Sequence, residues 1–294
     1  MTLSHTLKLF FVASVSLMLV ACGGGSGSGR TVIQNKGSDT LVNVAQAWAE
    51  NYSEVDPDVA IAVSGGGSGT GISAMINGTV DIANASREMK EDEIEAAQAN
   101  GIEPVEHIVG LDALAVFLHE DNPLEEITFE QLAGIYGEGG TINKWSDLGV
   151  TVPGCDSDEI VVVSRQNNSG TYVYFRETLL GDGDFKLGTR DMHGSKDVVD
   201  LVMNTPCAIG YSGLAYATDE VHMPCVYDEA GTCVTPSSET AIDRSYPIAR
   251  SLLMYTAGEP TGAVATYLEW VLSNEGQCII AEKGYAPVIE VDCG

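Results

Sequence analysis

Positive charge is scarce in this sequence. Its 294 residues include 14 Lys and Arg against 42 Asp and Glu, which gives a formal net charge of −28 at pH 7. Such a surface repels nucleic-acid backbones and anionic lipid head groups, so we expect no nucleic-acid partner. The same surface repels a free anion at long range. An anion site on this chain must therefore depend on local hydrogen-bond donors rather than on the overall field.

The motifs of several ligand classes are also absent. The chain has no C-x-x-C pair and its five histidines are scattered, so a zinc site is not expected. A Gly-rich stretch at residues 64–71 lacks the lysine of a nucleotide-binding P-loop. It also lacks the acidic residue that a dinucleotide-binding fingerprint places about 20 positions later. We therefore expect neither a cofactor nor a metal.

A run long enough to cross a membrane comfortably is missing as well, because the apolar stretch 9–20 is too short. It precedes Leu19-Val20-Ala21-Cys22-Gly23, which resembles the bacterial lipoprotein box. This pattern predicts a signal peptide over 1–21, and a lipidated Cys22 with a flexible tether over 22–30. The alternative is an ordinary signal peptide that happens to contain a cysteine.

The remaining six cysteines suggest disulfides, because an even number of cysteines in an exported protein favours pairing. Six cysteines allow fifteen connectivities. Close spacing in the chain favours the pairs Cys225–Cys233 and Cys278–Cys293, which leaves Cys155 with Cys207.

Three hydroxyl-rich turns follow β-like apolar segments and precede helical patterns. The first is the Gly-rich stretch 64–71, in which glycines allow close backbone approach and Ser68 supplies a hydroxyl donor. Similar turns occur at 37–40 and 168–171. Free N–H groups at helix N-termini favour anions, so the three turns predict a site for a small oxyanion. A Gly/Ser-rich run alone is more often a flexible linker, but three linkers of this design are hard to explain.

Alternating strand and helix patterns predict an α/β fold with a parallel or mixed sheet covered by helices. We expect Asp39 or Thr40 to cap the first helix, and Thr128 to cap another. A hairpin is expected at Cys225–Cys233. The expected strands are 31–35, 59–63, 80–85, 107–109, 114–118, 160–164, 208–211 and 246–255, and the expected helices are 44–52, 71–77, 91–100, 128–133, 172–180, 196–204 and 262–272.

An ordered set of motifs extends over about residues 31–291 and resembles the phosphate-binding proteins of bacterial phosphate ABC importers. The motifs that carry this resemblance are Gly37-Ser38-Asp39-Thr40, Gly65 to Gly71, Asp81 to Arg87, Ser169-Gly170-Thr171, Tyr246-Pro247-Ile248-Ala249-Arg250, 272–277 and 284–288. The resemblance implies a two-lobed periplasmic-binding-protein-like fold (type II), in which each lobe is a mixed sheet flanked by helices and the ligand lies in the cleft between them. Lobe 1 would comprise 31–113 plus 248–294, and lobe 2 would comprise 114–247.

The resemblance also implies a set of phosphate-binding residues. Arg165 would supply the main charge, Gly69 and Gly170 would donate backbone N–H groups, and Asn167 would hold Arg165 or the ligand. Each has an ordinary alternative, since Ser and Thr cap helices in many proteins and an arginine often forms a surface ion pair. The hydroxyl donors of the set are Ser38, Thr40, Ser68, Ser86, Ser169 and Thr171.

Two positions depart from the family pattern. Better-studied relatives have Asp where this chain has Arg87, and relatives often have Asp where Asn167 stands. Such a carboxylate accepts the proton of hydrogen phosphate, which sulfate lacks. We therefore expect Asp39 to be the acceptor that rejects sulfate, and Arg87 to be an added phosphate donor. Asp39 as a plain helix cap is the alternative.

The predicted function is high-affinity phosphate binding outside the cytoplasmic membrane by a lipid-anchored, periplasmic or extracytoplasmic monomer that delivers phosphate to an ABC permease. Alternatives are a receptor for sulfate, molybdate or arsenate, and a phosphate sensor or surface adhesin. An enzyme is not expected, because neither Ser68 nor Ser169 lies in a convincing G-x-S-x-G motif with an assignable base.

Overall fold

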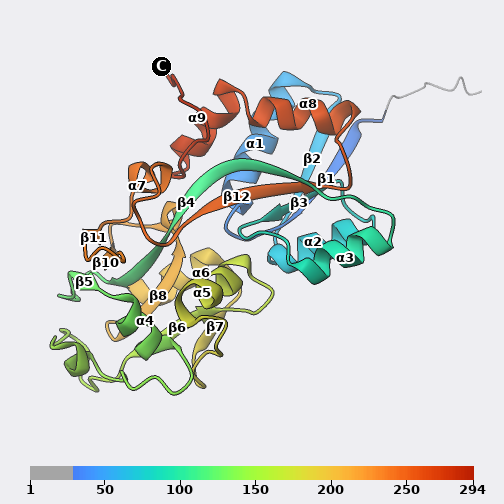
Figure 1. Ribbon diagram of the computed structural model, residues 1–294. Helices are drawn as coiled ribbons and strands as arrows, with labels where there is room; N and C mark the ends of the chain where they lie inside the picture. The colour runs from blue at the N-terminus through green and yellow to red at the C-terminus, as the bar shows by residue number, and fades with distance from the viewer. Residues whose placement is uncertain (1–28) are drawn as a thin grey trace, which may run out of the picture.

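A computed structural model describes residues 29–294, so the predicted signal peptide and Cys22 lie outside the described residues. Residues 29–294 form a mixed sheet of nine strands in the order β2-β1-β3-β12-β4-β8-β6-β7, with β9 beside β4, and a second, smaller sheet (Figure 1). Its strands are β1 (Thr31–Gly37), β2 (Val59–Ser64), β3 (Ile82–Ala85), β4 (Val105–His119), β6 (Val161–Arg165), β7 (Arg190–Met192), β8 (Ala208–Gly213), β9 (Val221–His222) and β12 (Ala249–Thr256).

Strand β4 joins the two halves of this sheet. Its residues 105–113 pair antiparallel with β12, and its residues 114–118 pair antiparallel with β8. We call β2-β1-β3-β12 with 105–113 the first half of the sheet, and the remainder of β4 with β8, β6, β7 and β9 the second half. Figure 1 shows β4 and β12 running together through the middle of the molecule. The prediction of separate strands at 107–109 and 114–118 was wrong, because Asp112 interrupts the apolar pattern without interrupting the strand.

Helices cover both faces of the first half. On one face, Trp48 of α1 and Tyr267 of α8 pack with Ile33 and Leu252 of the sheet. On the other face, Ile72 of α2 belongs to a second apolar cluster. Burial on both sides is typical of parallel α/β sheets. The helices of this half are α1 (Val42–Val55), α2 (Ser68–Ile76), α3 (Glu91–Ala99), α8 (Gly262–Val271) and α9 (Asn274–Glu282).

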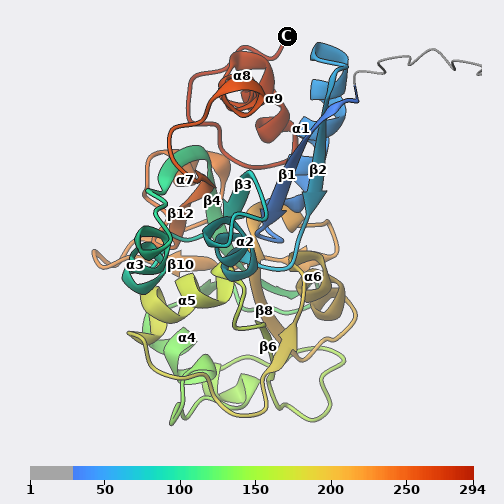
Figure 2. The same cartoon turned by 90° about the vertical axis from the view of Figure 1, so that its right-hand side faces the viewer.

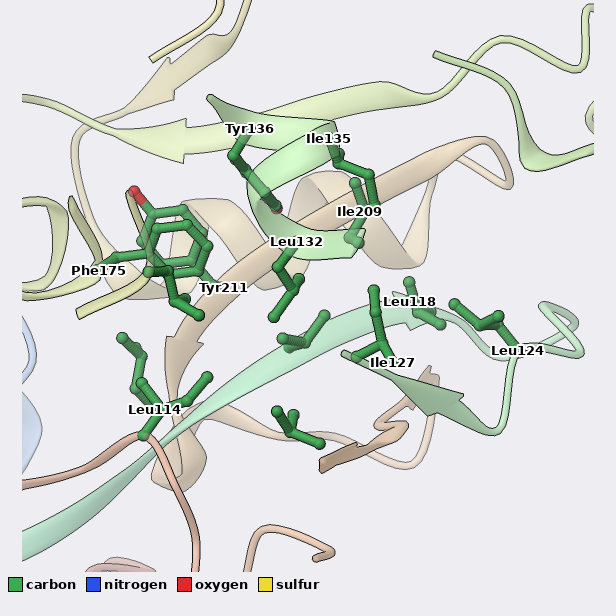
Figure 3. Close-up of a cluster of buried hydrophobic side chains, with 14 of the residues drawn as sticks. Leu114, Leu118, Leu124, Ile127, Leu132, Ile135, Tyr136, Phe175, Ile209 and Tyr211 are labelled. Carbon is green, nitrogen blue, oxygen red and sulfur yellow. The ribbon is translucent and has the colours of Figure 1, made fainter. Parts of the chain in front are cut away.

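An aromatic cluster holds α5 on the second half. The ring of Phe175 on α5 stacks on Tyr211 of β8 with centroids 3.8 Å apart, and Tyr136 of α4 meets Phe175 edge-on at 4.9 Å (Figure 3). Rings in these geometries attract one another beyond their burial. They fix α5 over β8 and so fix the position of its N-terminus. The helices of this half are α4 (Phe129–Tyr136), α5 (Gly170–Leu180), α6 (Ser195–Met203) and α7 (Ser238–Ile242), with 3₁₀ turns η1 (Trp145–Leu148) and η2 (Leu214–Tyr216).

The three predicted disulfides are confirmed: Cys155–Cys207, Cys225–Cys233 and Cys278–Cys293. The predicted hairpin is confirmed too, since its strands pair antiparallel beside β5. This small sheet comprises β5 (Glu126–Ile127), β10 (Cys225–Tyr227) and β11 (Cys233–Val234). The Thr128 cap is also confirmed, by the bond that its side chain accepts from Gln131 N.

Two predicted helix starts were wrong. Helix α2 begins at Ser68 rather than Gly71, because the low helix propensity of its Ser and Gly residues concealed its first turn. At α1 the N-cap residue is Leu41, not Asp39 or Thr40. Both of those side chains have partners elsewhere: Asp39 accepts a bond from Gly66 N, and Thr40 pairs with Thr171.

Candidate anion-binding site

The three hydroxyl-rich turns meet where the two halves of the sheet approach each other. Strands β1 and β2 are parallel neighbours and lead into α1 and α2, while β6 runs parallel to β8 and leads into α5. Figure 2 shows α2 next to α5 at this junction. Ligands of open α/β sheets bind outside the carboxyl ends of the strands. The junction therefore has the position expected of a ligand site.

Serine hydroxyls from three turns of the first half gather at one point. The Ser38 hydroxyl donates to Ser86 Oγ at 3.0 Å, and Ser68 Oγ lies 3.4 Å from Ser86 Oγ. The backbone N–H of Ser86 donates to Ser68 Oγ at 3.1 Å. All three residues are buried. The structure thus brings together Ser38, Ser68 and Ser86, which are up to 48 positions apart in the chain.

The second half contributes a buried arginine. Arg165 donates from Nη1 to Ser195 Oγ at 2.9 Å, and from Nη2 to the His193 carbonyl at 2.9 Å and to Asp39 Oδ2 at 3.3 Å. Its Nε has no hydrogen-bond partner among residues 29–294, although the side chain is only 1 % exposed. Burial lowers the pKa of Arg165, and the nearby Asp39 carboxylate opposes that change. The arginine stays protonated. A buried donor without an acceptor costs about 1–3 kcal/mol, so this N–H is available to an anion.

The start of α5 faces the serines of the first half. Ser169 caps this helix by accepting bonds from Thr171 N at 3.2 Å and Tyr172 N at 3.4 Å. A Cβ atom on Gly170 would lie 2.3 Å from Ser68 Oγ and 2.7 Å from Ser86 Oγ. Only glycine fits here, because any other side chain would force the two halves apart.

Further contacts connect the two halves directly. Thr40 Oγ1 and Thr171 Oγ1 are 3.0 Å apart. Asn168 accepts a bond from Gly69 N at 3.1 Å and donates from Nδ2 to the Gly66 carbonyl at 3.0 Å. The backbone N–H predicted to bind the ligand at Gly69 is thus bonded to Asn168 in this structure.

The terminal nitrogens of Arg87 have protein acceptors, its Nε has no hydrogen-bond partner among residues 29–294, and the predicted ligand roles of Arg87 and Asn167 stay predictions. Arg87 forms a two-point ion pair with Glu93, with Nη1–Oε2 at 2.7 Å and Nη2–Oε1 at 2.6 Å, and Nη1 also donates to the Glu88 carbonyl. Its terminal nitrogens are thereby held by a carboxylate. Asn167 is exposed, and its neighbour Asn168 makes the contacts between the halves.

Asp39 lies at the edge of the site beside Arg165. Its Oδ1 accepts from Gly66 N at 2.8 Å and its Oδ2 accepts from Arg165 Nη2. The phenol of Tyr216 donates to the Asp39 backbone carbonyl at 2.7 Å and thereby holds the turn. Each carboxylate oxygen retains a further lone pair, so Asp39 can accept a hydrogen bond from a protonated ligand oxygen.

Several residues that build the site were missed. Arg250 and Asp112 form a buried ion pair, with Asp112 Oδ2 2.8 Å from Nη2 and 3.0 Å from Nε of Arg250. Burial raises the pKa of Asp112 and the arginine opposes the rise. A signal was present, because each residue is a lone charge in an apolar extended run and a buried charge requires a partner. Asn168 and Ser195 gave no such signal.

The fixed charges of the site cancel. Arg165 and Arg250 are balanced by Asp39 and Asp112, and Arg87 is balanced by Glu93. An anion that enters therefore gains little from net charge. It must be held by the geometry of N–H and O–H donors, as the acidic composition of the chain requires.

Comparison with known proteins agrees with this picture. The model of the PBP superfamily domain matches residues 24–275. The phosphate-binding protein PstS of Pseudomonas aeruginosa is 34% identical over 268 residues, which cover 87% of this chain and 83% of that protein. PstS of Bacillus subtilis is 31% identical over 256 residues, covering 87% of this chain and 80% of that one.

A solved structure is similar over most of the chain. It is that of a putative phosphate ABC transporter substrate-binding protein from Clostridium perfringens with bound phosphate. It is 29% identical, with a TM-score of 0.77, and the match covers 88% of this chain and 100% of that one. The chain therefore belongs to the PBP superfamily and has the two-lobed binding-protein fold. Within that superfamily it is a member of the PstS-like phosphate-binding proteins.

Proposed function

We propose that this protein binds inorganic phosphate at the junction between the two halves of its sheet and delivers it to the permease of an ABC importer. The observation that carries the proposal is the buried Arg165 Nε without an acceptor, on an arginine that contacts Ser195 of its own half and Asp39 of the other half. A multiply charged anion is costly to desolvate, so nearly every oxygen needs a donor. The site supplies donors of this kind and few groups that would suit an apolar ligand.

We propose that Asp39 distinguishes hydrogen phosphate from sulfate. Hydrogen phosphate can donate its proton to the carboxylate, whereas sulfate presents only acceptors and would face an unpaired negative group. Arg165 holds Asp39 in place at 3.3 Å and Gly66 N fixes its other oxygen. Arg87, with its terminal nitrogens on Glu93, has the role of a neutralised neighbour in this proposal rather than that of a phosphate donor.

We also propose that the two halves act as lobes, with residues 31–113 and 248–294 in one and 114–247 in the other. The backbone N–H of Leu114 donates to the Ile248 carbonyl at 3.0 Å, so the two crossing segments lie side by side at the proposed boundary. Bending there would separate Ser68 from Gly170 and admit the ligand. Closing would bury the anion between donors of both lobes.

Catalysis is not part of the proposal. Nucleophilic attack by Ser68 or Ser169 would require an adjacent base. Among the described residues, neither hydroxyl has a His, Asp or Glu as a hydrogen-bond partner, because Ser68 bonds to Ser86 and Ser169 caps α5. Absence of turnover of a chromogenic phosphoester is the expected result.

We propose an extracytoplasmic monomer that is anchored through a lipid on Cys22. Within residues 29–294, no helix is both long enough and apolar enough to span a bilayer. Metabolic labelling with a fatty acid should mark the protein and should not mark the Cys22→Ser variant. Equal labelling of both would contradict the anchor.

The direct test is calorimetry on purified protein freed of bound ligand. We expect phosphate to bind one to one, with sulfate roughly 5- to 150-fold weaker, and the Asp39→Asn variant to lose most of that preference. The reason is that an unpaired polar group costs about 1–3 kcal/mol, or roughly 5- to 150-fold. Asp197→Asn removes a carboxylate that bonds to Gly194 N on the surface and serves as the control. Equal preference in wild type and Asp39→Asn would refute the role of Asp39, and absence of phosphate binding would refute the function.

A further inference from the structure

Every donor of the Arg250 guanidinium is engaged by the protein. Nε and Nη2 donate to Asp112, and Nη1 donates to the Ser86 carbonyl at 3.2 Å. The remaining two N–H groups point to hydroxyls: Nη1 donates to Thr171 Oγ1 at 3.1 Å and Nη2 to Thr40 Oγ1 at 3.5 Å. A guanidinium has five donors, so none remains for a ligand. This distinguishes Arg250 from Arg165, whose Nε has no partner in the described chain.

The surroundings hold this arginine rigidly. Asp112 Oδ1 accepts from Leu214 N at 3.1 Å, which leaves the carboxylate bonded on both oxygens. The ring of Tyr174 covers the Arg250 guanidinium at 5.7 Å, and its hydroxyl donates to the Ala249 carbonyl at 2.7 Å. Arg250 is 2 % exposed. Its orientation in this structure is therefore set by protein groups from both halves and not by a ligand.

The two threonine hydroxyls are constrained by this neighbour. A hydroxyl has one donor and two acceptor sites, and a guanidinium can only donate. Thr40 and Thr171 must therefore accept from Arg250, and neither can direct its proton to it. They also share one bond at 3.0 Å, in which either can be the donor. One proton of the pair is used in that bond, and the other is left to point away from Arg250.

We propose that Arg250 is a positioning residue that turns the hydroxyl protons of Thr40 and Thr171 away from itself, so that the proton not used between the two threonines is presented to an unprotonated phosphate oxygen. This inference rests on the proposed phosphate function. The inference adds an orientation of the bound ion to that function. The protonated oxygen of hydrogen phosphate faces Asp39, and an unprotonated oxygen faces the Thr40–Thr171 pair. Arg250 acts on the ligand only through these hydroxyls.

A double-mutant cycle tests this role with the full protein and inorganic phosphate. Arg250→Lys keeps a positive charge for Asp112 but loses the planar set of donors that reaches both threonines. We expect Thr171→Val to weaken phosphate binding by about 10-fold or more in the wild-type background, since a hydrogen bond to a charged group is lost. In the Arg250→Lys background the same change should cost less than about 3-fold, because the hydroxyl is no longer held as a donor.

A structural role alone would give a different pattern. If Arg250 only supported the fold, Arg250→Lys would lower the melting temperature, and the two changes in affinity would multiply without coupling. Arg176→Lys makes the same replacement at a surface arginine of α5 and should leave the affinity and the cycle unchanged. Should Arg250→Lys fold poorly, Asp112→Asn offers a second variant that loosens the same arginine, and its cycle with Thr171→Val should show the same coupling.

The outcomes separate the two proposals. A wild-type protein that fails to bind phosphate overturns the proposed function. A wild-type protein that binds phosphate, together with fully multiplicative effects in both cycles, overturns only the role of Arg250.

Discussion

Gly170 shows how strictly single residues define this site. Its Cα is so close to two serines of the opposite half that a methyl group would collide with both hydroxyls. Its φ is not in the left-handed region, so the requirement is one of space and not of backbone conformation. Gly67 has both constraints, with φ of 88° and a hypothetical Cβ 2.5 Å from the Asn168 carbonyl oxygen. Glycine thus permits the halves to meet, as the sequence suggested for the turn at 64–71.

The Gly170→Ala variant should therefore bind phosphate poorly while remaining folded. We expect a loss of affinity of about 100-fold or more, because closure would bring Cβ within 2.3 Å of Ser68 Oγ. Alanine is a better helix former than glycine, so the free energy of unfolding should be unchanged or raised by about 0.5–1 kcal/mol. Calorimetry and thermal melts without phosphate would check both points.

Gly69→Ala is the control at a neighbouring contact between the halves. Its Cβ would meet the Asn168 carbonyl oxygen at 3.4 Å, which is ordinary contact, so its affinity should stay within a few-fold of wild type. Equal affinities of Gly170→Ala and wild type would show that the halves need not meet here.

At the scale of elements, strands and helices with clear periodicity were predictable. The alternation that predicted β1, β2, α3 and α8 depends on local patterns that the tertiary structure does not override. Strand β4 was not predictable as one element, since its continuity depends on Asp112 finding Arg250 in a strand 138 positions later. Short elements such as β5 and β9 are defined by pairing partners and leave no local pattern.

The site divides in the same way. The hydroxyls of the three turns were predicted from the turn motifs, whereas Arg165, at the end of β6, and Ser86 were predicted only through the family resemblance. The pairing of Arg87 with Glu93 was missed although the two are six residues apart, since nothing in the sequence shows which way the side chain turns. Asn168 could not be preferred over Asn167 without knowing which one faces the opposite half.

The β4–β12 pair also gives the fold a dependence on pH. His107 on β4 bonds through Nε2 to Thr256 Oγ1 of β12 at 3.0 Å. Burial lowers the pKa of His107, and Glu259 and Glu106 oppose this change. Since the histidine of the unfolded chain keeps the higher pKa of about 6.5, it takes up a proton first as the pH falls. The contribution of His107 to stability is therefore present above about pH 6.5 and is lost below it.

The prediction is a smaller acid-induced loss of stability in His107→Gln. Chemical denaturation at pH 7.5 and at pH 5.5 would measure the free energy of unfolding of both proteins. The difference between the two pH values should be larger for wild type, because glutamine does not titrate. An equal difference in the two proteins would mean that His107 has the same pKa when folded and unfolded.

At the scale of the whole molecule, the main feature is a neutral junction inside a strongly acidic protein. The net charge of −28 repels phosphate from a distance, and the ion pairs of the site cancel one another. Affinity must then arise from donors that two halves of one sheet bring together. The family to which the chain belongs and the geometry of its turns lead to the same conclusion.

A crystal structure of the protein grown with phosphate tests this account most directly. We predict one phosphate enclosed at the junction, within hydrogen-bond distance of Arg165 Nε, of serine hydroxyls from the first half and of the Thr40–Thr171 pair, with Asp39 beside one oxygen. Phosphate bound elsewhere, or held by one half alone while the other half contributes no donor, would contradict it.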